Sequence, residues 1–154
     1  PPPAADGEAL LQFEVGVTEL QMQLEASLMR LARATRQRCV VIYGRGVLDV
    51  AAYLPRNQWP ALAATTGEVR RPLDWYNLIL HLVTAADGAE GSYASSDAAE
   101  SVDEALRLDR VMHEVQSAHP NYVRIDNSTG FDEKLRRATE LVVTRLAELE
   151  AQRG

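Results

Sequence analysis

Apolar residues recur at intervals of three and four along the first part of the chain, from about Glu8 to Thr35. The repeating positions are Phe13, Val17, Leu20, Leu24, Leu28 and Leu31. This spacing places them on one face of an α-helix. The sequence therefore predicts a long amphipathic helix whose Leu-rich stripe packs in a core rather than serving as an interaction surface, unless a part of the domain outside these residues is needed to cover it.

Three short apolar runs later in the chain predict β-strands. The first, Cys39–Tyr43, is rich in β-branched residues and ends at Gly44-Arg45-Gly46. Its continuous apolar character is typical of a strand buried on both faces, so Cys39 is expected to be buried and chemically inert. The second strand is predicted over Asn77–Thr84, and a third, weaker one over Tyr122–Asp126.

Helical patterns and a loop separate these strands. Val47–Tyr53 predicts a short helical turn, which Pro55 ends, and a second short helix is expected around Trp59. Ala85–Ser101 is rich in Ala, Gly, Ser and Asp and predicts a mobile loop.

Two longer helices complete the pattern. Ser101-Val102-Asp103-Glu104 matches a capping box, in which the Ser oxygen and the Glu carboxylate each accept a bond from a free backbone N–H. The apolar positions of the helix it opens are Val102, Ala105, Leu108, Met112 and Val115. Asn127, Ser128 and Thr129 offer N-cap residues for a last helix, whose apolar stripe is Phe131, Leu135, Ala138, Val142, Leu146 and Leu149.

Strands that alternate with helices predict an α/β fold with a parallel sheet and right-handed crossovers. In such sheets, ligands bind beyond the carboxyl ends of the strands. Three polar loops are expected at that edge: Gly44–Gly46, Thr84–Asp87 and Asp126–Ser128.

Composition narrows the class of protein. The 154 residues fit one domain, predicted over 8–150, with 1–7 as a loop or linker and 151–154 as a tail. The net charge of −6 argues against a nucleic-acid partner. The single cysteine suits a reducing, cytoplasmic compartment, and no apolar run is long enough for a transmembrane segment.

The sequence lacks a common phosphate-binding motif of parallel α/β proteins. No G-x-x-x-x-G-K-[ST] phosphate-binding loop (Walker A) occurs in these residues, and the chain's one lysine, Lys134, is far from any Gly-rich strand exit.

Several segments resemble one family. Val40-Val41-Ile42-Tyr43-Gly44-Arg45-Gly46-Val47-Leu48-Asp49 is similar to the Asp-Arg-Gly-x-x-Asp segment of the AAA-type domain shared by NadR ribosylnicotinamide kinases and TRPL translocation defect proteins. Ile79–Ala89 resembles that family's second strand and loop, and His119–Lys134 its last strand and helix.

The resemblance implies a nucleoside/nucleotide-kinase-like P-loop NTPase fold, a three-layer α/β/α parallel sheet. It implies that these residues are the C-terminal two-thirds of a domain, incomplete at the N-terminus, whose earlier part carries the first strand and the Walker A loop. It also implies ATP or GTP with Mg²⁺ as cofactor. One branch phosphorylates a nucleoside. The other binds GTP and phosphoinositide, and usually continues into a CYTH-like domain.

Two departures from the family pattern bear on catalysis. Gly44 stands where the family has the Asp before Arg-Gly, and glycine can act neither as a base nor as a metal ligand. Ala98 stands where the family's lid has an arginine that neutralises phosphoryl charge. Arg107 and Arg110 are the candidate substitutes.

The candidate site residues each have a structural alternative. Arg45 would bind a phosphate or ribose, or be a surface arginine in a turn; Asp49 would orient substrate or metal, or face water. Asp126, Asn127 and Ser128 would touch the base, or cap a helix. The remaining site candidate, Asp87, would lie near the phosphates or be an ordinary loop residue.

The histidines do not predict a metal site. His81 lies in a strand among apolar neighbours, as a hydrogen-bonded core histidine would, and His113 and His119 have no second ligand at metal spacing.

Two functions remain open. One is an ATP- or GTP-binding NTPase or small-molecule kinase domain, present here without its phosphate-binding loop and therefore inactive by itself. The other is a degenerate, non-catalytic binding or scaffold module with a protein or phosphoinositide partner.

Overall fold

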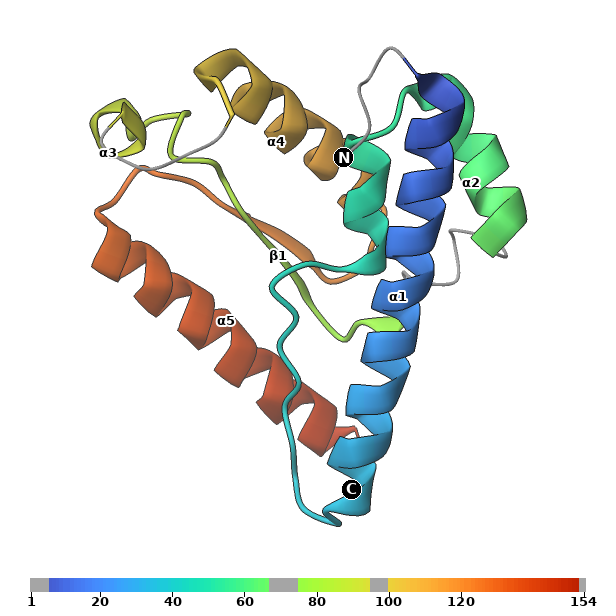
Figure 1. The fold of residues 1–154 in the computed structure, drawn as a ribbon. Coiled ribbons are helices and arrows are strands. Elements are labelled where there is room, and N and C mark those ends of the chain that lie inside the picture. The colour runs from blue at the N-terminus through green and yellow to red at the C-terminus, as the bar shows by residue number, and fades with distance from the viewer. Residues whose placement is uncertain (1–5, 67–74, 95–99, 153–154) are drawn as a thin grey trace. The chain divides into compact units, whose positions relative to one another are not determined.

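The computed structural model describes residues 6–66, 75–94 and 100–152. The chain forms two compact units, Pro1–Pro72 and Leu73–Gly154, and Figure 1 labels the α-helices of both and the strand β1 (Ile79–Leu82).

The first unit begins with α1 (Gly7–Ala34), which confirms the predicted amphipathic helix. Asp6 caps it, because its side chain accepts a hydrogen bond from the Ala9 N–H at 3.0 Å. Glu8 in the first turn and Arg33 in the last turn complement the helix dipole.

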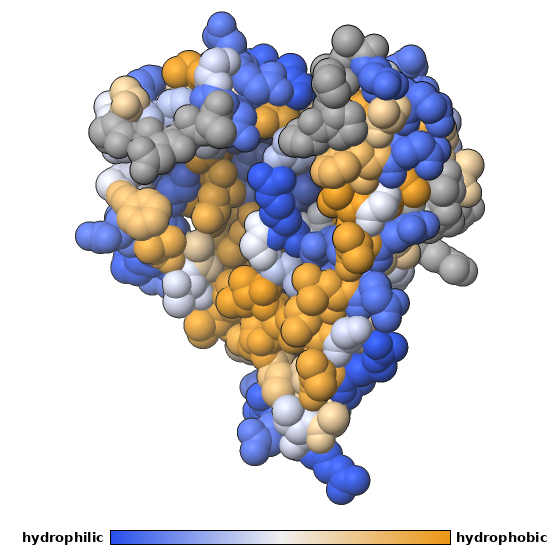
Figure 2. Space-filling view, in the orientation of Figure 1, coloured by the Kyte–Doolittle hydropathy of each residue, from blue (hydrophilic) through white to orange (hydrophobic). Residues whose placement is uncertain are grey.

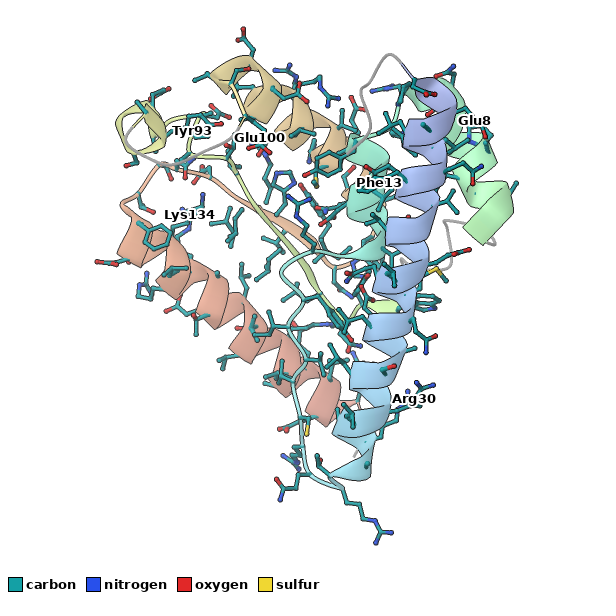
Figure 3. The ribbon with its side chains drawn as sticks, in the orientation of Figure 1. Glu8, Phe13, Arg30, Tyr93, Glu100 and Lys134 are labelled. Atoms are coloured by element: carbon teal, nitrogen blue, oxygen red, sulfur yellow. The ribbon has the colours of Figure 1, made fainter. Side chains whose placement is uncertain are left out.

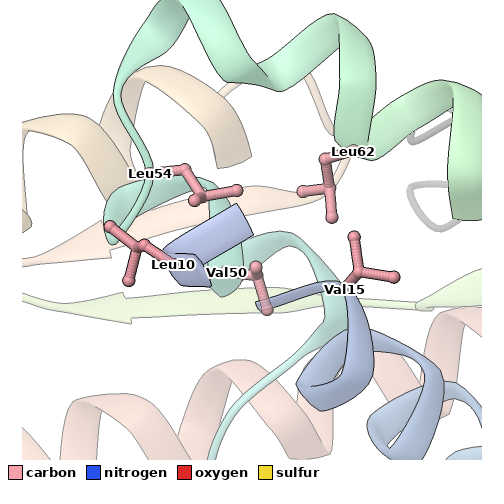
Figure 4. Packing of buried hydrophobic residues seen from close by; sticks show 5 residues of the cluster. All are labelled: Leu10, Val15, Val50, Leu54 and Leu62. Atoms are coloured by element: carbon pink, nitrogen blue, oxygen red, sulfur yellow. The ribbon is translucent and has the colours of Figure 1, made fainter. Parts of the chain in front are cut away.

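The predicted short helices follow as η1 (Val47–Ala52), η2 (Arg56–Gln58) and α2 (Trp59–Thr66). They pack with α1 around a small apolar core, shown in Figure 4, that consists of Leu10, Val15, Val50, Leu54 and Leu62. Trp59 packs against this core, and its indole N–H donates to the Ala51 carbonyl at 3.0 Å. We call these five side chains the apolar core of the first unit.

The predicted Leu-rich stripe of α1 is not the face that the structure buries. The buried positions are Leu10, Glu14, Val15, Thr18 and Glu25. The exposed positions, with Leu20 at 73%, are Phe13, Val17, Leu20, Leu24 and Leu31. Figure 2 shows exposed apolar residues in orange on the face of the molecule that it draws. Three of the buried positions, Glu14, Thr18 and Glu25, lie one residue, or about 100° around the helix, from stripe positions. The offset arises because η1 and α2 cover the neighbouring face.

The strand predicted over Cys39–Tyr43 is wrong. These residues form neither helix nor strand, and Cys39 and Ile42 are exposed, Ile42 at 80%. A strand is stable only beside a hydrogen-bonding partner, and within the described residues the sheet contains only the other two predicted strands.

The second unit contains those strands, β1 (Ile79–Leu82) and β2 (Tyr122–Ile125). They pair in parallel, from Ile79 opposite Tyr122 to Leu82 opposite Ile125. The α/β class and the parallel pairing are therefore confirmed for this unit, whereas the full three-layer sheet stays a prediction.

Three helices accompany the strands: α3 (Glu90–Ala94), α4 (Val102–Gln116) and α5 (Phe131–Ala151). α4 contacts β1 and α5 contacts β2, and the two helices lie on opposite sides of the strands (Figure 1). Ser101 caps α4 as predicted, since its Oγ accepts from the Glu104 N–H at 3.2 Å. The Glu104 carboxylate accepts instead from the Arg107 guanidinium.

Two further expectations about this unit need correction. The predicted loop over Ala85–Ser101 contains the short helix α3. Tyr93, in the last turn of α3, donates its hydroxyl hydrogen to the Glu100 carbonyl at 2.7 Å (Figure 3). The N-cap of α5 is Gly130 rather than Asn127, Ser128 or Thr129. Asn127 and Ser128 are not caps because their side chains bond other groups. Within the described ranges, no helix is both long and apolar enough to cross a membrane.

Candidate functional site

Four of the predicted site residues gather where β1 and β2 end. The parallel pairing continues past the strands, where the Val83 N–H donates to the Ile125 carbonyl at 3.0 Å. Beyond this bond the two following loops lie together, and they carry Asp87 on one side and Asp126, Asn127 and Ser128 on the other. With Thr84 and Lys134, these residues are called the strand-edge cluster below.

Asn127 links the two loops. Its Nδ2 donates to the Thr84 carbonyl at 2.7 Å and to the Asp87 carbonyl at 2.6 Å. Its Oδ1 accepts from Lys134 Nζ at 2.6 Å. The amide group is therefore occupied by the protein itself, and Asn127 shapes the site instead of reaching out from it.

Lys134 is the buried cation of the cluster, with 7% of its surface exposed. It projects from the first turn of α5 (Figure 3), and Nζ donates to the Val83 carbonyl at 2.7 Å as well as to Asn127. Burial lowers the pKa of Lys134, and the negative charges of Asp109 and Asp126 partly oppose this shift. Sequence reasoning missed Lys134. The sequence contained a signal for its burial: Lys134 is the chain's one lysine, and it lies three residues after Phe131, the first position of the apolar stripe of the last helix.

Asp126 provides an exposed carboxylate in the cluster. It accepts from the Ser128 hydroxyl at 2.6 Å, from the Ser128 N–H at 3.3 Å and from Arg137 Nη1 at 3.0 Å. These bonds, those from Ser128 first, lower its pKa to about 2. Asp126 is exposed and ionised at neutral pH, so it presents a fixed negative charge at the edge of the sheet.

Asp109, on α4, is a second residue that sequence reasoning missed. Its Oδ1 accepts from His81 Nε2 and from the Thr84 N–H, both at 2.9 Å, and Oδ2 accepts from Arg124 Nη2 at 3.3 Å. Arg124 in turn lies 3.5 Å from the Asp87 carboxylate. Asp109 therefore connects the strand-edge cluster to the interior. A charged residue four positions after Ala105, on the apolar stripe of α4, was the signal.

Burial acts to raise the pKa of Asp109, but the hydrogen bonds from His81, the Thr84 amide and Arg124 outweigh it, so the pKa is lowered. An ionised carboxylate only accepts hydrogen bonds, so His81 Nε2 carries the proton.

His81 is buried, as expected, but only one of its ring nitrogens is satisfied. Its Nδ1 has no hydrogen-bond partner within the described part of the chain. The rings of Tyr122 and His113 lie with their centroids 6.0 and 6.2 Å away, and His113 Nδ1 is 2.8 Å from the Tyr122 hydroxyl. Burial raises the pKa of Tyr122 to about 12, so this hydroxyl stays protonated.

The two arginines considered as substitutes for a lid arginine are placed differently. Arg110 is exposed on α4, one residue after Asp109, and Arg107 forms an ion pair with Glu104 at 2.7 Å. Ala98, the departure in the family's lid, lies outside the described residues.

The remaining predicted residues, Arg45 and Asp49, belong to the first unit. The guanidinium of Arg45 lies over the Tyr53 ring, 5.2 Å from the ring centroid. The backbone carbonyl of Arg45 accepts a hydrogen bond from the Gln21 side chain at 3.0 Å. The Asp49 carboxylate accepts from the Gly46 N–H at 3.1 Å, at the start of η1. Asp49 thus has a structural role in the turn that follows Arg45.

The first unit also buries an acid near this turn. Glu14, on α1, is 6% exposed. Burial raises the pKa of Glu14, and the positive charge of Arg45 acts in the opposite direction. No group of three or more His, Cys, Asp or Glu side chains within the described ranges is arranged to hold a metal ion.

A family model described as an AAA domain matches residues 4–134. The chain belongs to the AAA domain family. No curated protein and no solved structure matches it. Membership places the chain among P-loop NTPase-like, nucleotide-binding domains, and the matched range of the AAA domain includes every residue of the strand-edge cluster.

Proposed function

We propose that this AAA domain binds the nucleoside part of a purine nucleotide at the strand-edge cluster and belongs to a small-molecule kinase-like NTPase. The observation that supports this proposal is the meeting of Asp87, Asp126, Asn127 and Ser128 at the carboxyl edge of two parallel strands. Ligands of open α/β folds bind at this edge. Asp126 is ionised and exposed there, so it can accept hydrogen bonds from ribose hydroxyls or base amino groups.

The cluster suits a nucleoside better than a triphosphate. Binding of phosphates in this class of protein requires backbone N–H groups and a lysine from a glycine-rich loop. Here the one lysine is buried and donates to two protein oxygens, Val83 O and Asn127 Oδ1. The proposal therefore assigns the phosphates and Mg²⁺ of ATP or GTP to a Walker A loop outside these 154 residues. Arg45 is proposed to serve the phosphate-accepting substrate, and Asp49 to hold the turn that follows Arg45.

The test is a titration of the isotope-labelled 154-residue chain with magnesium ATP and magnesium GTP, followed by NMR. Because the phosphate loop is missing, we expect a Kd of about 1 mM or weaker, corresponding to roughly −4 kcal/mol. Amide shifts should be confined to residues 84–88 and 126–129. Adenosine and guanosine should produce the same pattern without the phosphates.

Matched variants sharpen this test. Asp126→Asn removes the exposed charge and should abolish the localised shifts. Asp103→Asn removes an exposed charge in the first turn of α4 and should leave them unchanged. Shifts scattered over both units, or none at saturating nucleoside, would refute a nucleoside site at the strand edge. Micromolar binding would instead reveal a phosphate site elsewhere in these residues.

A second function, a non-catalytic binding module, is favoured by Gly44. This residue is exposed and provides no carboxylate where the resembled kinases have one. Co-sedimentation with vesicles that contain a phosphoinositide tests this alternative. Binding to those vesicles, with no response to any nucleoside, would replace the kinase-like proposal.

A further inference from the structure

Lys134 stands apart from the other cations of this chain. It is the chain's one lysine, and it is buried, whereas the arginines of the same helix form ion pairs with exposed acidic side chains. Arg136, two residues later on α5, contacts Glu133 and Glu140, both exposed or half-exposed partners within four residues of it. Lys134 instead reaches Val83, which is distant in sequence.

The bonds of Lys134 and Asn127 join three segments. Lys134 Nζ holds the end of β1 through the Val83 carbonyl, and it holds the loop after β2 through Asn127 Oδ1. Asn127 Nδ2 then holds the loop after β1 through Thr84 and Asp87. Hydrogen bonds donated by a charged ammonium group are stronger than those between neutral groups. The ammonium group of Lys134 therefore sets the spacing between the two loops.

The loop after β1 passes close to Asn127. Gly88 has a positive φ of 84°, and a Cβ placed there would lie 3.5 Å from Asn127 Cβ. The chain therefore turns directly against Asn127, and loss of the Lys134–Asn127 bond would release the turn together with Asp87.

We propose that Lys134 is a positioning residue of the strand-edge site, which holds Asp87 and Asp126 at the separation that the nucleoside requires. This inference rests on the proposed function. Lys134 touches no ligand in this scheme and acts through Asn127.

The experiment compares two variants of the full 154-residue chain. Lys134→Met keeps the length of the apolar stem and removes the donors. Arg136→Met makes the same change of charge on the same helix but leaves both loops untouched. Binding of adenosine and guanosine is measured by NMR from the amides of residues 84–88 and 126–129. We expect Lys134→Met to weaken binding about tenfold or more, as the loss of a charged hydrogen bond would, and Arg136→Met to match the parent chain.

A second measurement uses the parent chain and therefore does not depend on how well Lys134→Met folds. Biosynthetic incorporation of ¹³C,¹⁵N-labelled lysine labels the one lysine without altering it, and the signal of its ε-methylene group is followed during the nucleoside titration. Because Asn127 connects Lys134 to the ligand-facing loops, we expect this signal to shift with the same Kd as the loop amides. Unlabelled protein serves as the control for unchanged binding.

The outcomes separate the two proposals. If the parent chain shows no response to either nucleoside, the proposed function fails and this inference fails with it. If the parent chain binds and a folded Lys134→Met binds equally well, or the lysine signal does not move, only the positioning role is overturned. Rescue of binding in Lys134→Arg, which keeps a cationic donor, would support that role further.

Discussion

The interiors of the two units differ in the kinds of side chain that they bury. The first unit surrounds five aliphatic side chains with one long and several short helices. The second unit buries His81, Asp109, His119 and Lys134 beside a smaller set of apolar residues such as Val83 and Ile125. An apolar core gains free energy from burial itself, whereas a buried polar group is tolerated only when it is hydrogen-bonded.

This difference indicates where each unit can carry function. Two buried polar groups of the second unit, Asp109 and Lys134, bond the segments that follow its strands, through the Thr84 N–H, the Val83 carbonyl and Asn127 Oδ1. The apolar core of the first unit determines where α1, η1 and α2 pack, but it contains no group that could exchange a proton. The strand-edge cluster is therefore the part of the described structure in which sequence changes should affect binding and stability together.

The largest effect is expected from truncation of the apolar core. Leu54 is 4% exposed, and Leu54→Ala should destabilise the first unit by about 3 kcal/mol, because it loses apolar burial and leaves a cavity. Urea unfolding followed by the fluorescence of Trp59, in a Trp75→Phe background, reports on this unit alone. Leu20→Ala, at a position 73% exposed, is the control and should change stability by less than about 0.5 kcal/mol. Equal effects would mean that the two residues share one environment.

The second prediction breaks the polar interior of the other unit. Asp109→Asn keeps the shape of the side chain but turns an N–H toward the donors of His81, Thr84 or Arg124. We expect a loss of about 2 kcal/mol, since at least one buried donor loses its acceptor. The Thr84 N–H donates a hydrogen bond to the Asp109 carboxylate at 2.9 Å, so hydrogen exchange of this amide should accelerate strongly. Protection of this amide equal to that in the parent chain would show that the carboxylate does not hold it.

The third prediction is that the two units respond to acid with opposite signs. Burial raises the pKa of Glu14 above 4.5, so the folded first unit takes up a proton before the unfolded chain does and gains stability as the pH falls through that range. The pKa of Asp109 is lowered below 3.8, so the second unit loses stability as the pH falls from 3.8 through the folded value.

Urea unfolding between neutral pH and about pH 3 tests this sign difference, with Trp59 fluorescence for the first unit and the Thr84 amide for the second. Glu14→Gln should remove the gain in the first unit. Asp109→Asn should flatten the loss in the second. A parallel decline of both units with acid, unaltered by either substitution, would contradict the assignment.

How much of this could be predicted from the sequence differs between the two units as well. The periodic spacing in α1 and the apolar runs of β1 and β2 predicted real elements, because helix and strand periods follow from local geometry. The face that α1 buries was missed by one residue, since that face depends on where η1 and α2 pack. The Cys39–Tyr43 strand was wrong for a related reason: its apolar run is necessary for a buried strand, but a partner strand is also required.

The candidate site shows the same division. Asp87 and Asp126 to Ser128 could be placed at one edge because parallel strands end together. Asp109 and Lys134 were not placed there, although each lies on the apolar stripe of its helix, because the rotation of a helix about its axis decides whether a charged residue points inward. The roles of Asn127 and Ser128 as N-caps were also wrong: the pattern matched, but Lys134 and Asp126 offered stronger partners.

The smallest predicted effect concerns the turn that closes over Asn127. Gly88 has a φ of 84°, in the left-handed region that residues with a Cβ rarely adopt. Gly88→Ala should therefore destabilise the second unit by about 1 kcal/mol. Gly91 is the matched control, because it lies in α3 with nothing within 4 Å of its Cβ position in the described structure. Gly91→Ala should be neutral or slightly stabilising, since alanine favours helix. Thermal unfolding of both variants, followed by NMR of the Asn127 side-chain amide, distinguishes them. If Gly88→Ala were as benign as Gly91→Ala, the loop would have another path open to it, and the closeness of Gly88 to Asn127 would not be a requirement of the site.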